Sequence, residues 1–173
     1  MDVLKAVKER RSIRAFKSDE VSPEIVEKLL DAARWAPSAG NIQPWEFIVV
    51  RKPEIKRALA EAALDQTFIE EAAVVLVVCA NGSRSSQRYG MRGKTLYCIQ
   101  DTAAAIQNIN LAAYSLGLGT CWVGAFMEEK AREILKTPPE VRPIAIIPIG
   151  YPTEVPPPRS RRPLNEVVHY EIF

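Results

Sequence analysis

The sequence has little of what hydrolytic, metal or disulfide chemistry needs. Its 173 residues include one histidine, His169, and three cysteines, Cys79, Cys98 and Cys121. A single histidine argues against a Ser-His-Asp triad or a multi-histidine metal site. The cysteines form no C-x-x-C pair and are odd in number, which argues against a disulfide framework or a zinc knuckle. We interpret them as buried, reduced thiols.

Three further absences narrow the class of protein. No apolar run reaches the roughly 18 residues that span a bilayer, and no uninterrupted hydrophobic signal segment opens the chain, so we expect a soluble, cytoplasmic protein without membrane partners. Neither common glycine-rich phosphate cradle, G-x-x-x-x-G-K-[ST] or G-x-G-x-x-G after a strand, is present. The net charge of +2, without an RNP-like aromatic motif, disfavours nucleic-acid binding.

What is present predicts one globular domain over residues 1–173. Hydrophobic residues make up 47% of the chain, enough for a sizeable core. Periodicity and capping predict helices at 3–9, 23–36, 53–63, 96–116 and 128–136, and strands at 46–50, 74–80, 120–123 and 143–149. The continuous β-branched run at 74–80 predicts a central strand that is buried on both faces. The fold class is α+β, with a sheet between helices.

A stiff polar loop joins the second helix to the first strand, in the segment ARWAPSAGNIQPWEF, residues 33–47. Most connections take about 4–6 residues, and this one is longer, with Pro37 and Pro44 at its edges. Small and amide side chains stand between the two prolines. Such a loop is typical of a segment that presents polar groups to a ligand.

Arginines gather at two places far apart in the chain, RRSIR at 10–14 and RSRR at 159–162. In extended geometry Arg10, Ser12 and Arg14 point to one side, as do Arg159 and Arg161. Each set offers a fork of donors that suits a phosphate or carbonyl oxygen. A solvated basic face is the alternative for either cluster alone. Together with the amide-bearing loop, the two clusters favour an anionic, hydrogen-bonding ligand.

The C-terminal segment, residues 151–173, is expected to be an extended arm. Its prolines favour polyproline geometry, in which residues 151–163 span ~40 Å, beyond the ~16 Å radius of gyration expected for a chain of this length. Val168, Tyr170 and Ile172 then alternate as an edge strand would. An isolated strand is unstable, so the arm must dock, either on a second subunit, which we favour, or around its own.

Four motifs, RRSIRAF, ARWAPSAGNIQPWEF, GLGTCWVGAF and IGYP followed by RSRRPLNEVVHY, resemble the FMN-dependent nitroreductase family in its short form. The resemblance covers nearly the whole chain, in order. It implies a mixed, mainly antiparallel sheet flanked by helices, in an intertwined homodimer whose arms exchange. It also implies one FMN in each of two interface sites. Hydride from NADH or NADPH would then pass through flavin N5 to a small oxidised acceptor, such as a nitroaromatic or quinone, by a ping-pong mechanism.

The resemblance assigns residues to the flavin but no catalytic side chain and no metal. Residues expected at the phosphate and ribityl end are Arg10, Arg11, Ser12, Arg159 and Arg161. Arg14 would reach the pyrimidine edge near N1 and O2. Residues expected against the flavin that the other subunit mainly binds are Pro37, Ser38, Ala39, Asn41 and Gln43.

The remaining residues implied by the resemblance surround the reactive edge of the ring. The turn Cys121-Trp122-Val123-Gly124 would place backbone groups beside N5, and Gln66 would add a contact to the ring edge. Many longer members have a glutamate where Val123 aligns, so any role of that carboxylate is absent here. Cys121 is either a redox thiol or, as we favour, a packed cysteine.

Two questions stay open from the sequence. The polar stretch 81–94 carries four cations that suit the phosphates of NAD(P)H or an anionic acceptor, and it forms either a mobile lid or a plain surface loop. The reaction is also not unique to the fold. A reductive dehalogenase or a flavin-fragmenting enzyme of the same family, or a non-catalytic flavin-storage protein, are the alternatives to an NAD(P)H-dependent oxidoreductase.

Overall fold

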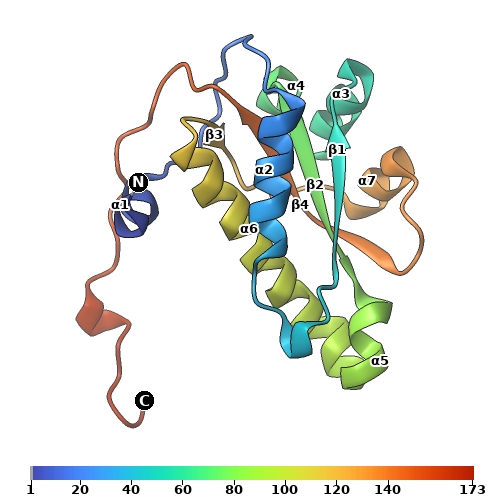
Figure 1. Cartoon of the computed structure of the whole chain (residues 1–173), viewed down its shortest axis with the longest axis vertical. Coiled ribbons are helices and arrows are strands. Elements are labelled where there is room, and N and C mark those ends of the chain that lie inside the picture. Colours follow the sequence, from blue (N-terminus) through green and yellow to red (C-terminus); the bar gives the residue numbers. More distant parts are fainter. Residues whose placement is uncertain (1) are drawn as a thin grey trace.

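A four-stranded antiparallel sheet with the order β1-β2-β4-β3 forms the middle of the molecule (Figure 1). The structure, a computed structural model, describes residues 2–173. The strands are β1 (Trp45–Val50), β2 (Val74–Asn81), β3 (Gly119–Thr120) and β4 (Val141–Gly150). A parallel bridge joins Ser12 to Thr120 at the edge of β3. The predicted mixed, mainly antiparallel sheet is confirmed.

Helices flank this sheet. They are α1 (Val3–Glu9), α2 (Pro23–Arg34), α3 (Pro53–Ala62), α4 (Phe68–Glu71), α5 (Gly82–Arg92), α6 (Cys98–Ser115) and α7 (Glu128–Leu135). Ser22 caps α2 with its hydroxyl, and Gly117 takes a φ of 76° just after α6, where a residue without Cβ is favoured. Among residues 2–173, no helix combines the length and apolarity that a membrane crossing requires.

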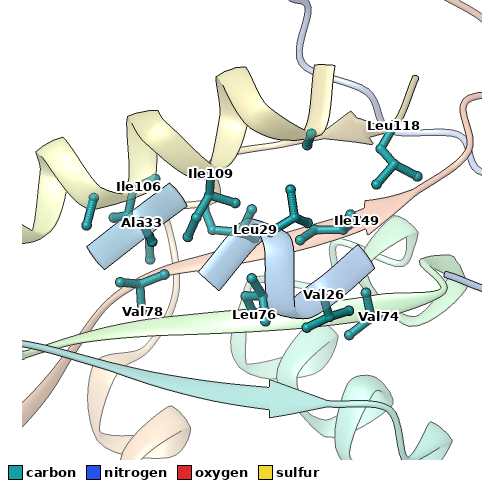
Figure 2. Packing of buried hydrophobic residues seen from close by; sticks show 14 of the residues in the cluster. Val26, Leu29, Ala33, Val74, Leu76, Val78, Ile106, Ile109, Leu118 and Ile149 are labelled. Carbon is teal, nitrogen blue, oxygen red and sulfur yellow. The ribbon is translucent and has the colours of Figure 1, made fainter. Parts of the chain in front are cut away.

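The core lies on both faces of the sheet because β2 is apolar along its whole length. Leu76 and its neighbours at alternate positions pack against α2 and α6, where Leu29, Ile106 and Ile109 meet them (Figure 2). Val75, Val77 and Cys79 face the other way, toward α3, α4 and α7. The prediction of a central strand buried on both faces is confirmed, and so is the α+β arrangement.

Two sequence-based expectations need correction. Residues 81–94 form no loop, because the Asn81 side chain accepts a bond from the Arg84 N–H (3.0 Å) and starts α5, which runs into a π-helical turn, Gly93–Tyr97. Val168, Tyr170 and Ile172 form no strand in the single chain, since no neighbouring strand is there to pair with them. A short 3-10 turn, Leu164–Glu166, precedes them.

The segment that carries the first arginine cluster is fixed to the sheet edge. The Ile13 N–H donates to the Thr120 carbonyl (2.9 Å), and the Ile13 side chain is buried against Gly119. Farther along, the Lys17 N–H donates to the Tyr151 carbonyl (2.8 Å), while the Thr153 N–H donates to Ala15 (3.1 Å). The N-terminal segment and the start of the C-terminal arm therefore run side by side.

This anchor gives the first prediction. A Cβ added at Gly119 would lie 2.6 Å from the Ile13 side chain, so Gly119→Ala forces Ile13 out of its place and is expected to lower the free energy of unfolding by about 1–3 kcal/mol. Gly124→Ala is the control, because its Cβ meets nothing within 4 Å, and it should stay within about 0.5 kcal/mol of the parent. Urea unfolding of the three proteins, at one protein concentration, measures both values. Equal stability of the three would contradict the anchor.

Candidate functional site

The two arginine clusters meet in one cleft, which we call the basic cleft. Its cavity volume is about 420 Å³, within the range of about 300–1,000 Å³ that small-molecule sites occupy. The lining residues are Arg10, Arg11, Ser12, Arg14, Pro156, Pro157, Arg159 and Arg161. The convergence follows from the pairing of residues 15–17 with 151–153, which lays the arm across the N-terminal segment. The sequence predicted that these arginines serve one ligand, and the structure brings them together.

The charge of the basic cleft is not balanced within the chain. None of the ion pairs within residues 2–173 involves an arginine of the cleft. Burial lowers the pKa of Arg10, and the positive charges of Arg11 and Arg161 act in the same direction against the opposing influence of Cys121. Arg161 donates only to backbone carbonyls of its own arm. Such a set of guanidinium groups favours an anion that accepts their hydrogen bonds.

Arg14 extends from the same segment over an aromatic ring. Its guanidinium carbon lies 5.8 Å from the centre of the Phe68 ring in α4, a cation–π distance. Sequence reasoning missed Phe68, because nothing in the chain signals that α4 faces residue 14. The structure thus gives Arg14 a support that fixes its direction.

Cys121 is buried behind these arginines. Only 1% of its surface is exposed, and burial raises the pKa of its thiol, against the opposing charges of Arg14 and Arg10 and a bond with Ser12. Cys79 and Cys98 are buried and reduced as well, and burial raises the pKa of Cys79 to about 12. A thiol that stays protonated and shielded is a poor redox group. The prediction that the three cysteines are packed in the interior is confirmed.

Among the described residues, the turn after Cys121 leaves the N–H groups of Trp122 and Gly124 without a hydrogen-bond partner. The Val123 N–H is already bound to the Ile146 carbonyl (3.0 Å), so it has no bond to offer a ligand. Gly124 is exposed, and the space that its Cβ would occupy is empty to 4 Å. Gln66 donates to the Ala125 carbonyl (3.1 Å) and so lies against the same turn, while its predicted contact with the flavin ring stays a prediction. Of the predicted backbone contacts, that at Gly124 fits a flat ring best.

Residues 37–43, here called the amide loop, take a strained conformation. Gly40, Asn41 and Gln43 all have φ near +55°, which glycine and asparagine tolerate but which costs about 1–2 kcal/mol at Gln43. Inside the loop, the Gln43 N–H donates to the Ser38 hydroxyl (3.0 Å), and the Gln43 amide donates to the Asn41 side chain (3.2 Å). The loop is thus organised, with exposed amides.

The amide loop and the basic cleft lie at opposite ends of α6. The Ala39 N–H donates to Asp101 in the first turn of α6, whereas Tyr114 in its last turn donates to Glu9, next to Arg10. At 1.5 Å per residue, the two ends are about 20 Å apart. Figure 1 shows this arrangement, with the turn after α2 beside α5 and with α1 toward the other end of α6. Within one chain, the amide loop and the basic cleft are therefore separated by about the length of α6.

A second cavity, of about 400 Å³, lies between the start of α5 and α7. Lys94, Arg132, Arg142, Glu128 and Glu140 are among its lining residues, so cations and carboxylates are mixed there. None of the predicted flavin residues lines it. Its Arg142 is already paired with Glu128 (2.9 Å). The basic cleft is therefore the better candidate for an anionic ligand.

Comparison with known proteins agrees with this geometry. The profile of the Nitroreductase family matches residues 7–81 and 62–151 of the chain. The chain belongs to the Nitroreductase family. The matched range begins just before the first arginine cluster and ends at Tyr151, where the arm begins. The resemblance seen in the sequence motifs is confirmed.

Individual members of the nitroreductase family match over most of the chain. A protein of Methanothermobacter thermautotrophicus, provisionally named NADH dehydrogenase/NAD(P)H nitroreductase, is 41% identical over 160 residues, which are 90% of this chain and 80% of the relative. A Bacillus subtilis protein named FMN reductase (NADPH) is 29% identical, over 99% of this chain and 74% of its own length. A crystal structure from Parabacteroides distasonis, with the same provisional name as the first relative, is 30% identical with a TM-score of 0.88 and covers 99% and 98% of the two chains.

Proposed function

We propose that the protein is an NAD(P)H-dependent FMN oxidoreductase that reduces a small oxidised acceptor, such as a nitroaromatic or a quinone. The observation that carries the proposal is the basic cleft, in which arginines from two distant segments gather without a carboxylate partner. A flavin phosphate supplies the missing negative charge. The names of the relatives, which include an FMN reductase and an NAD(P)H nitroreductase, support the same cofactor and reductant.

The residues of the basic cleft fit one end of FMN. Arg10, Arg11 and Ser12, with Arg159 and Arg161 from the arm, hold the phosphate and the ribityl chain through charge-assisted bonds. Arg14, supported by Phe68, faces the pyrimidine edge of the ring, where a positive charge favours electron uptake.

The N5 edge of the ring would face the turn at 121–124. The Gly124 N–H, in an exposed turn where an added Cβ would meet nothing within 4 Å, would be the backbone donor for the N5 edge, and Gln66 holds the turn in place. When bound, FMN supplies the hydride chemistry at N5, so the chain needs few acids and bases of its own. This explains a chain with one histidine, which stands exposed in the arm.

With FMN bound, the reductant and the acceptor would occupy the same open face in turn, in a ping-pong mechanism. The turn at 121–124 supports this reading, because Trp122 and Gly124 are both exposed and leave room above the N5 edge. NAD(P)H must leave before the acceptor enters, since both approach the same atom. The protein's part is to bind and orient the cofactor and the substrates and to exclude competing groups.

The site is completed by a second copy of the chain. The amide loop and the basic cleft of one chain contact opposite ends of α6, about 20 Å apart along the helix axis, and the proposal assigns the loop to the cleft of a partner. Apolar side chains that the single chain leaves exposed support this homodimer: Val3, Leu4 and Val7 on α1, and Leu164, Tyr170 and Ile172 on the arm. The start of the arm stays with its own chain, where Arg159 and Arg161 line the cleft, and the rest of the arm, residues 162–173, would cross to the partner.

Anaerobic titration with NADH or NADPH tests the function. The purified protein is expected to be yellow, with one FMN per chain, and the flavin absorbance is expected to bleach on addition of one equivalent of the preferred reductant. A nitroaromatic or quinone added afterwards should restore the colour. A flavin-storage protein would keep its colour with either reductant. In a family member with another reaction, the flavin absorbance would bleach, but these acceptors would not reoxidise the flavin.

Replacement of single arginines tests the cleft. Arg10→Ala and Arg161→Ala each remove a charge-assisted bond and are expected to weaken FMN binding by about 1.5–3 kcal/mol, tenfold or more. Arg162→Ala is the matched control, because Arg162 pairs with Glu166 (3.2 Å) and does not line the cleft. Fluorescence titration of FMN measures all three. Equal affinity in the Arg10, Arg161 and Arg162 variants would remove the phosphate site from this cleft.

A further inference from the structure

Asp101 is an unusual residue for its place in the chain. It is the one charged residue in positions 95–127, a stretch of apolar, amide and hydroxyl side chains. It lies in the first turn of α6, with 8% of its surface exposed. No cation forms an ion pair with it within residues 2–173. A carboxylate buried without a cation is costly, so a specific contact must account for it.

The contacts of Asp101 point to the amide loop. Its Oδ1 atom accepts a hydrogen bond from the Ala39 N–H (3.1 Å), across 62 positions of the chain. Its Oδ2 atom is buried and has no partner. Burial raises the pKa of Asp101, and the bond from Ala39 opposes this shift. The one interaction that stabilises the carboxylate is therefore the bond that holds the loop.

Two arginines of α5 hold the same loop from the other side. Arg84 donates to the Gln43 carbonyl (3.1 Å), and Arg88 donates to the Gly40 carbonyl (3.4 Å). A Cβ added at Gly40 would lie 2.5 Å from the Tyr89 hydroxyl, so α5 packs directly on the loop. These arginines bind the backbone carbonyls of Gly40 and Gln43, two of the residues with positive φ. The amide side chains of Asn41 and Gln43 stay exposed.

We propose that Asp101 is a positioning residue, which together with Arg84 and Arg88 clamps the amide loop in the conformation that faces the flavin. The inference rests on the proposed function, because it takes the loop as part of a flavin site. Without the clamp, the left-handed residues of the loop relax to common backbone conformations, and their amides turn away. Asp101 itself touches no ligand and acts through Ala39.

Three variants of the full-length, FMN-loaded protein test the clamp. Asp101→Ala removes the acceptor for the Ala39 N–H and is expected to weaken FMN binding about tenfold and to shift the visible absorption band of the bound flavin. Asp101→Asn keeps an oxygen at this position, so it should retain FMN affinity within about threefold of the parent. Thr102→Val is the matched control, because Thr102 is buried in the same turn and its hydroxyl bonds only the Cys98 carbonyl (2.6 Å). It should leave the spectrum unchanged.

A further variant keeps the test valid if Asp101→Ala fails to fold. Arg84→Ala combined with Arg88→Ala changes exposed residues of α5 and is expected to give the same spectral shift. An unchanged FMN affinity and spectrum in this double variant and in Asp101→Ala would overturn the inference alone. Equal losses in Asp101→Ala and Thr102→Val would also overturn it, since they would reflect packing. Failure of the unaltered protein to bind FMN would instead overturn the proposed function, and the clamp with it.

Discussion

The site depends on a short piece of backbone pairing that holds two positive segments together. Residues 13–17 bond to Thr120, Tyr151 and Thr153, and the sheet edge therefore carries both arginine clusters, which lie almost 150 positions apart in the chain. Guanidinium groups of like charge repel, and the half-buried Arg10 loses further solvation. The fold tolerates this arrangement because backbone bonds and the buried Ile13 fix it. An anion bound in the basic cleft would offset the free-energy cost of this repulsion and desolvation.

A second constraint is the length of α6. Its first turn holds the amide loop through Asp101, and its last turn holds the N-terminal segment through Tyr114. A rigid helix thus keeps the two halves of the proposed site about 20 Å apart within one chain. In our proposal, two chains related by symmetry place each loop over the other's cleft, and two complete sites arise from two incomplete ones. Exposed apolar residues on α1 and the arm are consistent with that assembly.

The elements of the fold and the two arginine clusters could be predicted from local patterns, whereas the convergence of the clusters on one phosphate was implied only by the family resemblance. The β-branched run at 74–80, the caps at Ser22 and Gly117, and the alternation within RRSIR each depend on neighbours in sequence. The supports of the site could not be predicted, because Phe68, Arg84 and Arg88 act across long distances in the chain. Asp101 is the one charged residue in positions 95–127, and this isolation was the available signal that it is special. Helical periodicity, however, does not predict which group a buried carboxylate contacts. Helix α5 was missed because it has a polar sequence and is held by packing on the amide loop.

Activity of hybrid dimers tests most directly whether two chains share each site. One parent carries Arg10→Ala with Arg14→Ala, and the other carries Asn41→Ala with Gln43→Ala. In the hybrid, a shared arrangement puts both lesions in one site and leaves the other site intact. The account then predicts that isolated hybrids regain FMN and NAD(P)H oxidation at about half the wild-type sites, although both parents are inactive. No recovery in verified hybrids would contradict it, because a site built from one chain keeps one lesion in every copy.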